Sequence, residues 1–176
     1  MRILAVDPAT RSGWAVGSPG EKAVYGTITM PKRPVLGERL LFLLNRLREL
    51  IIEHRPDLIV AEEPFMPHDQ SQWATVQLGQ KIEGCVLMAA AEAGLPIETY
   101  TPAAWRLDFI GFGRAPRGAT ANFMKVAVRE RLLVLGYRVA NSDESDALGL
   151  LLAALHGRSA AARAQGDLLA RASEGL

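Results

Sequence analysis

Apolar residues near the start of the chain fall in short runs that turn residues separate. The first run ends at Asp7-Pro8, and its continuous apolar character is typical of a buried strand. A later stretch alternates apolar with polar or small residues until Pro31 stops it. The pattern predicts three strands joined by tight turns, at residues 3–6, 14–16 and 24–30.

From about residue 35 the apolar positions recur at helical spacing, and Pro56 follows that segment. Thr101-Pro102 is a favourable start for a helix, because threonine can cap the first turn and proline fits the first helical position. Asn141 and Glu144 have the spacing of a capping box. The remaining predicted strands are 58–61 and 96–100, and the predicted helices are 35–53, 70–93, a short one from 102, 119–135, and one from 141 or 142 to about 156.

Strands followed by alternating helices and strands indicate an α/β fold, in which helices cover both faces of a mixed sheet. Residues 1–156 are predicted to form one domain. Residues 157–176 are rich in Ala and Arg without a clear apolar stripe, so we expect a loosely ordered or helical tail.

Composition changes this picture little. The 176 residues include 20 basic and 19 acidic side chains, a net charge of +1, so any nucleic-acid surface must arise from local segregation of charge. Cys85 is the single cysteine, which excludes an intramolecular disulfide and fits a reducing compartment. The sequence shows neither a targeting pattern nor an apolar run of about 20 residues. We therefore expect a cytoplasmic protein without a membrane partner.

Acidic residues stand where predicted elements meet. Asp7 ends the first strand, Glu62 and Glu63 end the fourth, and Asp143 and Asp146 share one face at the start of the last core helix. Adjacent strand ends converge at one edge of an α/β sheet, where sites tend to form. Taken alone, each acid is more simply explained as a turn former or helix cap. Their conjunction favours a shared site.

A cluster of carboxylates is unstable unless a cation compensates its charge. Magnesium prefers oxygen ligands, and a pair of ions about 4 Å apart suits hydrolysis of a phosphodiester without a covalent intermediate. Successive strand residues point to opposite faces, so one of Glu62 and Glu63 should face the site and the other should not. The sequence thus predicts a site for two divalent ions.

Four ordered motifs resemble the RuvC family of Holliday-junction resolvases, within the ribonuclease H-like superfamily. They span about residues 1–156. The similar segments are Asp7-Pro8-Ala9-Thr10-Arg11-Ser12-Gly13-Trp14-Ala15, Glu62-Glu63-Pro64-Phe65-Met66, Leu78-Gly79-Gln80, and Ser142-Asp143-Glu144-Ser145-Asp146-Ala147-Leu148. Gly84 lies one residue later than the family spacing, and residues 66–74 differ from the commonest pattern.

The resemblance implies a five-stranded mixed sheet of order 3-2-1-4-5 and a catalytic site of Asp7, Glu62, Asp143 and Asp146. It implies two Mg²⁺ ions per site, with Mn²⁺ able to substitute, and Asp7 bridging both. It further implies a homodimer that makes paired nicks across a four-way DNA junction and leaves 5′-phosphate and 3′-hydroxyl ends. A branch-migration helicase is a further candidate partner. Phe65 falls at a family position that contacts a base near the junction, although a core phenylalanine is an equal alternative.

Basic residues gather between about 104 and 138, where acids are few. Arg106, Arg114, Arg117 and Lys125 are candidates for phosphate contacts, which position a duplex without reading its sequence. A solvated helix face is the ordinary alternative for any one of them.

Three other functions stay open at this stage. The acids alone would also suit a related ribonuclease H-like nuclease with a broader branched-DNA or RNA substrate. The segment from Asp7 to Gly13 also resembles the phosphate loop of the actin and sugar-kinase type of nucleotide-binding module, although the chain is too short for two such domains. A DNA binder that does not cut is the third alternative.

Overall fold

The structure, a computed structural model, describes the backbone of residues 1–64 and 73–174 and the side chains as far as Arg158. Phe65, the predicted base contact, lies outside the described residues. The elements in chain order are β1 (Ile3–Asp7), β2 (Arg11–Gly17), β3 (Val24–Thr29), α1 (Leu36–His54), β4 (Leu58–Glu62), α2 (Trp73–Glu92), β5 (Ile97–Tyr100), α3 (Pro102–Ile110), α4 (Phe123–Val134) and α5 (Ser142–Glu174).

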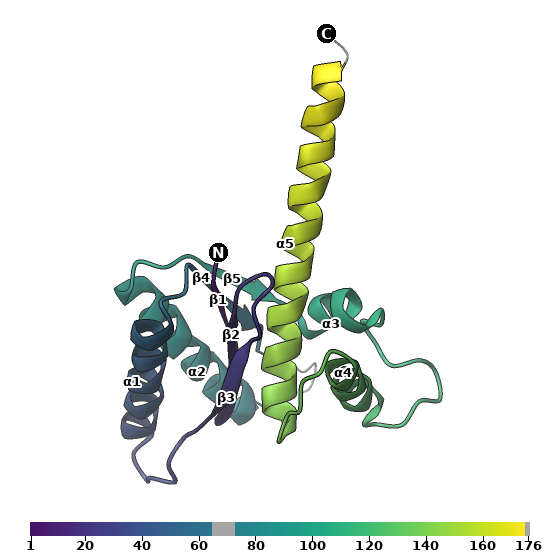
Figure 1. Cartoon of the computed structure of the whole chain (residues 1–176). Helices are drawn as coiled ribbons and strands as arrows, with labels where there is room; N and C mark the ends of the chain where they lie inside the picture. The colour runs from purple at the N-terminus through teal and green to yellow at the C-terminus, as the bar shows by residue number, and fades with distance from the viewer. Residues whose placement is uncertain (65–72, 175–176) are drawn as a thin grey trace.

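The five strands form one mixed sheet in the order β3-β2-β1-β4-β5, which confirms the expected order (Figure 1). The first three strands are an antiparallel meander, and β1, β4 and β5 run parallel. The central strands β1 and β4 are buried on both faces, which explains why their sequences are continuous apolar runs. β1 therefore lies at the centre of the molecule.

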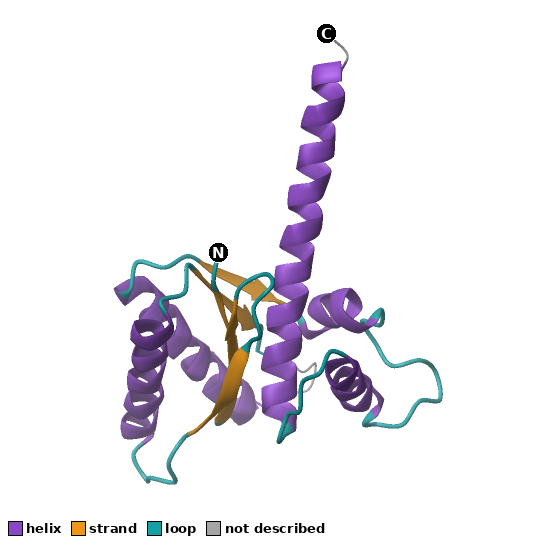
Figure 2. Ribbon diagram, viewed as in Figure 1, coloured by secondary structure: helices purple, strands orange, loops and turns teal. Residues whose placement is uncertain are grey.

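Helices cover both faces of the sheet, as predicted (Figure 2). On one face, α1 and α2 pack against alternate residues of β1 and β4, including Leu4 and Ile59. On the other face, α3, α4 and α5 pack against Ile3, Ala5 and Val60. Successive residues of β1 and of β4 thus contribute alternately to two separate hydrophobic cores.

Two predicted helix boundaries were wrong. The helix expected from about 119 begins at Phe123, because the preceding residues form turns and Gly118 has a φ of 83°. The last core helix was expected to end near His156, before a loosely ordered or helical tail. Instead α5 continues without a break through Gly157 to Glu174, in line with the helical alternative, and extends beyond the rest of the molecule (Figure 1). Alanine favours helix at several of these tail positions, including 160–162.

Among the described residues we find no helix with both the length and the apolarity that crossing a bilayer requires.

Candidate active site

The ends of β1 and β4 place the first two acids side by side. These strands are parallel neighbours, with Val6 opposite Ala61, so the next residues along them are Asp7 and Glu62. Glu63 turns to the other face, where its carboxylate accepts a hydrogen bond from Thr99 at 3.3 Å. Burial raises the pKa of the neighbouring Glu83, and the charge of Glu63 raises it further. The alternation expected for Glu62 and Glu63 is therefore present, and Glu62 faces Asp7.

The start of α5 brings the other two acids to this edge. Gly13 of β2 is the register partner of Asp7, and the first turn of α5 lies directly on it. A Cβ atom at Gly13 would stand 1.9 Å from the carbonyl oxygen of Asp143, closer than any side chain allows. The missing side chain of Gly13 is thus what lets the helix carrying Asp143 and Asp146 approach Asp7.

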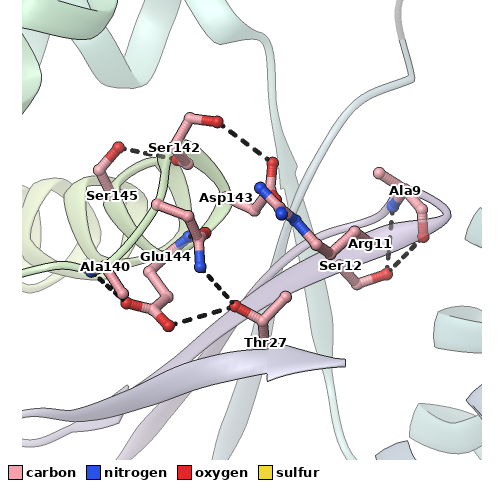
Figure 3. Close-up of polar contacts among 10 residues, drawn as sticks. Ala9, Arg11, Ser12, Thr27, Ala140, Ser142, Asp143, Glu144 and Ser145 are labelled. Carbon is pink, nitrogen blue, oxygen red and sulfur yellow. Dashed lines mark hydrogen bonds and ion pairs between the residues drawn. The ribbon is translucent and has the colours of Figure 1, made fainter. Parts of the chain in front are cut away.

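Hydrogen bonds hold that helix start against the meander (Figure 3). Asn141 accepts from the backbone N–H of Glu144 at 2.9 Å, as the capping-box spacing predicts. The Glu144 carboxylate accepts from the backbone N–H of Ala140 at 2.8 Å. Both side chains also contact Thr27 of β3, at 3.1 and 3.3 Å. The cap therefore fixes the position of α5 on the sheet as well as its first turn.

Burial and mutual repulsion raise the pKa values of three acids. Burial is the largest cause of the raised pKa of Asp7, followed by the negative charges of Glu62, Asp146 and Asp143. Burial also raises the pKa of Glu62, although a hydrogen bond from Trp105 opposes it. Burial likewise raises the pKa of Asp146 against the positive charges of Arg106 and Lys125. The four carboxylates consequently form one electrostatic group around Asp7.

Three of the acids are bound by protein donors. Arg11 donates to Asp143, and the indole N–H of Trp105 donates to Glu62. Arg106 lies 3.7 Å from Asp146 as an ion pair. Within the described part of the chain, no three acidic, histidine or cysteine side chains have an arrangement that would itself hold a metal ion. Repelling carboxylates here face arginine and tryptophan donors instead of converging on one point.

The donor set nevertheless fits a hard divalent cation. The side chains offer carboxylate oxygens, which Mg²⁺ prefers. Asp146 is 9% exposed, and its Oδ1 is a buried acceptor without a hydrogen-bond partner among the described residues. A buried acceptor of this kind is costly unless a cation or donor reaches it. The site therefore has the composition and one vacant acceptor that a metal requires.

The metal-free protein should lose stability as the pH rises. Asp7 has a raised pKa when folded, so above its unfolded pKa of about 3.9 the folded chain keeps a proton that the unfolded chain has lost. The free energy of unfolding therefore falls as the pH rises from the unfolded to the folded pKa of Asp7, and it stays low above the folded pKa. The side chain introduced by Asp7→Asn carries no charge at any pH. In EDTA the unfolding free energy of this variant should therefore exceed that of the wild type by about 1 kcal/mol near neutral pH, and by less near pH 4.

Urea unfolding of both proteins across this pH range measures the effect. A difference in unfolding free energy that does not change with pH would contradict the burial-driven shift. Acids remote from the site titrate alike in both proteins, so the pH-dependent difference reports on Asp7 together with the carboxylates that its charge reaches.

The predicted phosphate contacts occupy two environments. Arg114, Arg117 and Lys125 are exposed, and the charge of Lys125 reaches Asp146. Arg106 instead lies in the site, paired with Asp146. Sequence reasoning missed the roles of Arg11 and Trp105. Arg11 lies inside a motif that drew attention only to its acid, and a tryptophan inside an apolar helix signals core packing rather than a donor.

The chain is similar to known proteins along most of its length. A family model described as crossover junction endodeoxyribonuclease RuvC matches residues 3–156. RuvC of Halorhodospira halophila is 34% identical, over 90% of this chain and 92% of that protein. RuvC of Xanthobacter autotrophicus is also 34% identical, over 96% and 97%. The structure of Thermus thermophilus RuvC in complex with a Holliday junction substrate is similar with a TM-score of 0.68 and 26% identity, over 91% of this chain and 96% of that chain.

Proposed function

The chain belongs to the family of RuvC crossover junction endodeoxyribonucleases, and from that premise we propose that it cuts four-way DNA junctions by metal-dependent hydrolysis. The observation that carries the proposal for this chain is that neighbouring strand ends and the start of α5 place Asp7, Glu62, Asp143 and Asp146 at one edge of the sheet, as one group of partly buried, mutually repelling carboxylates. Family membership favours this function over the nucleotide-binding and RNA-directed alternatives.

The four acids would hold two divalent ions, with Asp7 at the centre because the charges of all three others reach it. When bound, the ions would activate a water molecule and stabilise the charge of the leaving oxygen. The chain itself supplies the orientation of the ligands: strand ends fix Asp7 and Glu62, and the capped start of α5 fixes Asp143 and Asp146. The Mg²⁺ preference and the number of ions are part of the proposal.

Two arginines pair with the acids of the site. Arg11 and Arg106 each pair with one aspartate of α5, so positive charge is already present where the ions would add it. Both side chains are partly exposed, at 48% and 20%, and so could turn toward a phosphate once the aspartates bind metal. Arg114, Arg117 and Lys125 would extend this contact along the duplex backbone.

A panel of matched substrates tests the function. With Mg²⁺, the protein should cut a four-way junction at least about 100-fold faster than the linear duplex of the same sequence, because a structure-selective site gains binding energy from the branch. A flap and an RNA–DNA hybrid complete the panel. EDTA should abolish cleavage, and Mn²⁺ should restore it. Equal cleavage of all substrates, or a preference for the hybrid, would replace junction resolution with a broader nuclease activity.

We extend the proposal to a homodimer that nicks two opposed strands. Cleavage of a plasmid with an extruded cruciform distinguishes paired from single nicks, because paired nicks yield linear DNA whereas single nicks yield open circles. Accumulation of open circles alone would contradict the paired arrangement. A branch-migration helicase as partner and a cytoplasmic location remain predictions from the sequence.

A further inference from the structure

We infer that Trp105 is a positioning residue of the active site, which holds the carboxylate of Glu62 in one orientation through its indole N–H. The inference rests on the proposed function for its kinetic consequence, but its structural basis is independent of the substrate. Trp105 is fully buried in α3, and its Nε1 donates to Oε2 of Glu62 at 2.5 Å. Because the side chain has no exposed surface, it acts through Glu62 rather than on DNA.

The hydrogen bond joins two groups that each need it. An indole N–H buried among apolar side chains costs free energy without an acceptor, and Glu62 is itself partly buried. The terminal torsion of a glutamate is broad, so a free carboxylate would sample many orientations. Holding Oε2 restricts that torsion and therefore keeps the ligand atoms of Glu62 in place beside Asp7.

The same ring is also linked to Asp146 on α5, through Arg106. The guanidinium carbon of Arg106 lies 4.9 Å from the centre of the Trp105 ring, as a cation–π contact. Arg106 in turn pairs with Asp146 at 3.7 Å. One buried side chain thus contacts Glu62 directly and Asp146 through a single intermediary, which joins the β4 side of the site to the α5 side.

The packing around the ring is specific to its size. Gly149 lies one turn beyond Asp146 on α5, and a Cβ there would stand 2.8 Å from Cζ3 of Trp105. The glycine therefore leaves a notch that the indole fills. Trp105 lies near the start of α3. Thr101 caps that start, because its side chain accepts a hydrogen bond from the backbone N–H of Ala104 at 3.2 Å. The notch and the cap determine where the N–H points.

Trp105→Phe tests the inference, because it removes the N–H and keeps an aromatic ring. Loss of a group that orients a metal ligand typically lowers metal affinity or activity about 10–100-fold. We expect the affinity for Mn²⁺, measured by calorimetry, and the single-turnover cleavage rate at saturating metal and junction to fall by that factor. Junction affinity should not change. Trp14→Phe is the matched control, since Trp14 packs against His54 on the opposite face of the sheet.

The two readouts separate positioning from simple packing. A variant that is merely less stable, with wild-type Mn²⁺ affinity and cleavage rate, would overturn the inference. If Trp105→Phe fails to fold, benzothienylalanine at position 105 keeps the ring shape with sulfur in place of the N–H, and the same losses are expected. A wild type that binds Mn²⁺ but cuts no junction would refute the proposed function alone. A wild type that binds no Mn²⁺ would refute both.

Discussion

Asp7→Asn should abolish junction cleavage and leave junction binding intact. Asp7 is the carboxylate that all three other acids influence, so neutralising it removes the centre of the proposed metal site. We expect the cleavage rate to fall at least about 1,000-fold, which corresponds to about 4 kcal/mol of transition-state stabilisation. Binding should hold or tighten slightly, because one negative charge near the phosphates is gone. Single-turnover cleavage and a gel-shift titration measure the two quantities.

The neighbouring glutamates supply a matched control. Glu62→Gln should lose activity like Asp7→Asn, whereas Glu63→Gln should keep it, because Glu63 lies on the other face beside Thr99 and Glu83. Both variants remove one charge from adjacent positions, so a nonspecific electrostatic effect would lower both alike. Cleavage at the wild-type rate by Asp7→Asn or Glu62→Gln would end the site assignment.

Gly13→Ala should impair both stability and cleavage. The new Cβ would stand 1.9 Å from the backbone oxygen and 2.4 Å from the backbone carbon of Asp143, so the first turn of α5 must move away from β2. Overpacking against backbone should cost about 3 kcal/mol of unfolding free energy. Misplacement of a catalytic group by about 1 Å can cost about 100-fold in rate, and two aspartates would move together here. Denaturant unfolding and metal-dependent cleavage measure the two losses.

Gly17→Ala is the control on the same strand. Its Cβ would meet side-chain atoms of Leu151 and Ala23 at 3.3 and 3.4 Å, contacts that small shifts can relieve. We therefore expect a change in unfolding free energy within about 1 kcal/mol and unchanged cleavage. Gly13→Ala with wild-type stability and activity would show that the approach of α5 to β2 does not position the site.

The sheet was predictable because its strands obey simple burial rules. β1 and β4 are covered on both faces and so read as unbroken apolar runs, whereas proline or glycine punctuates the meander. The start of α5 was predictable from its capping residues, which make the expected hydrogen bond. The start of α4 was not, since an apolar pattern does not distinguish the preceding turns from a first helical turn.

The location of the acids could be inferred from the sequence, but their protein partners could not. Strand ends and a helix start converge by general rules, which brought Asp7, Glu62 and the α5 aspartates into one hypothesis. The bonds of Trp105 to Glu62 and of Arg11 to Asp143 join residues 43 and 132 positions apart. Such contacts depend on how helices dock on the sheet, which periodicity does not encode. The catalytic roles themselves stay predictions.

The placement of two acids on the last helix has a consequence for synthesis. Asp7 leaves the ribosome early, whereas Asp143 and Asp146 come near the C-terminal end of the matched region and reach Asp7 only when α5 docks across Gly13. A chain that ends before Asp143 therefore carries only Asp7 and Glu62 of the four acids. On the proposed function such a product would not cut DNA, so activity would arise only after α5 has been synthesised and has docked on the sheet.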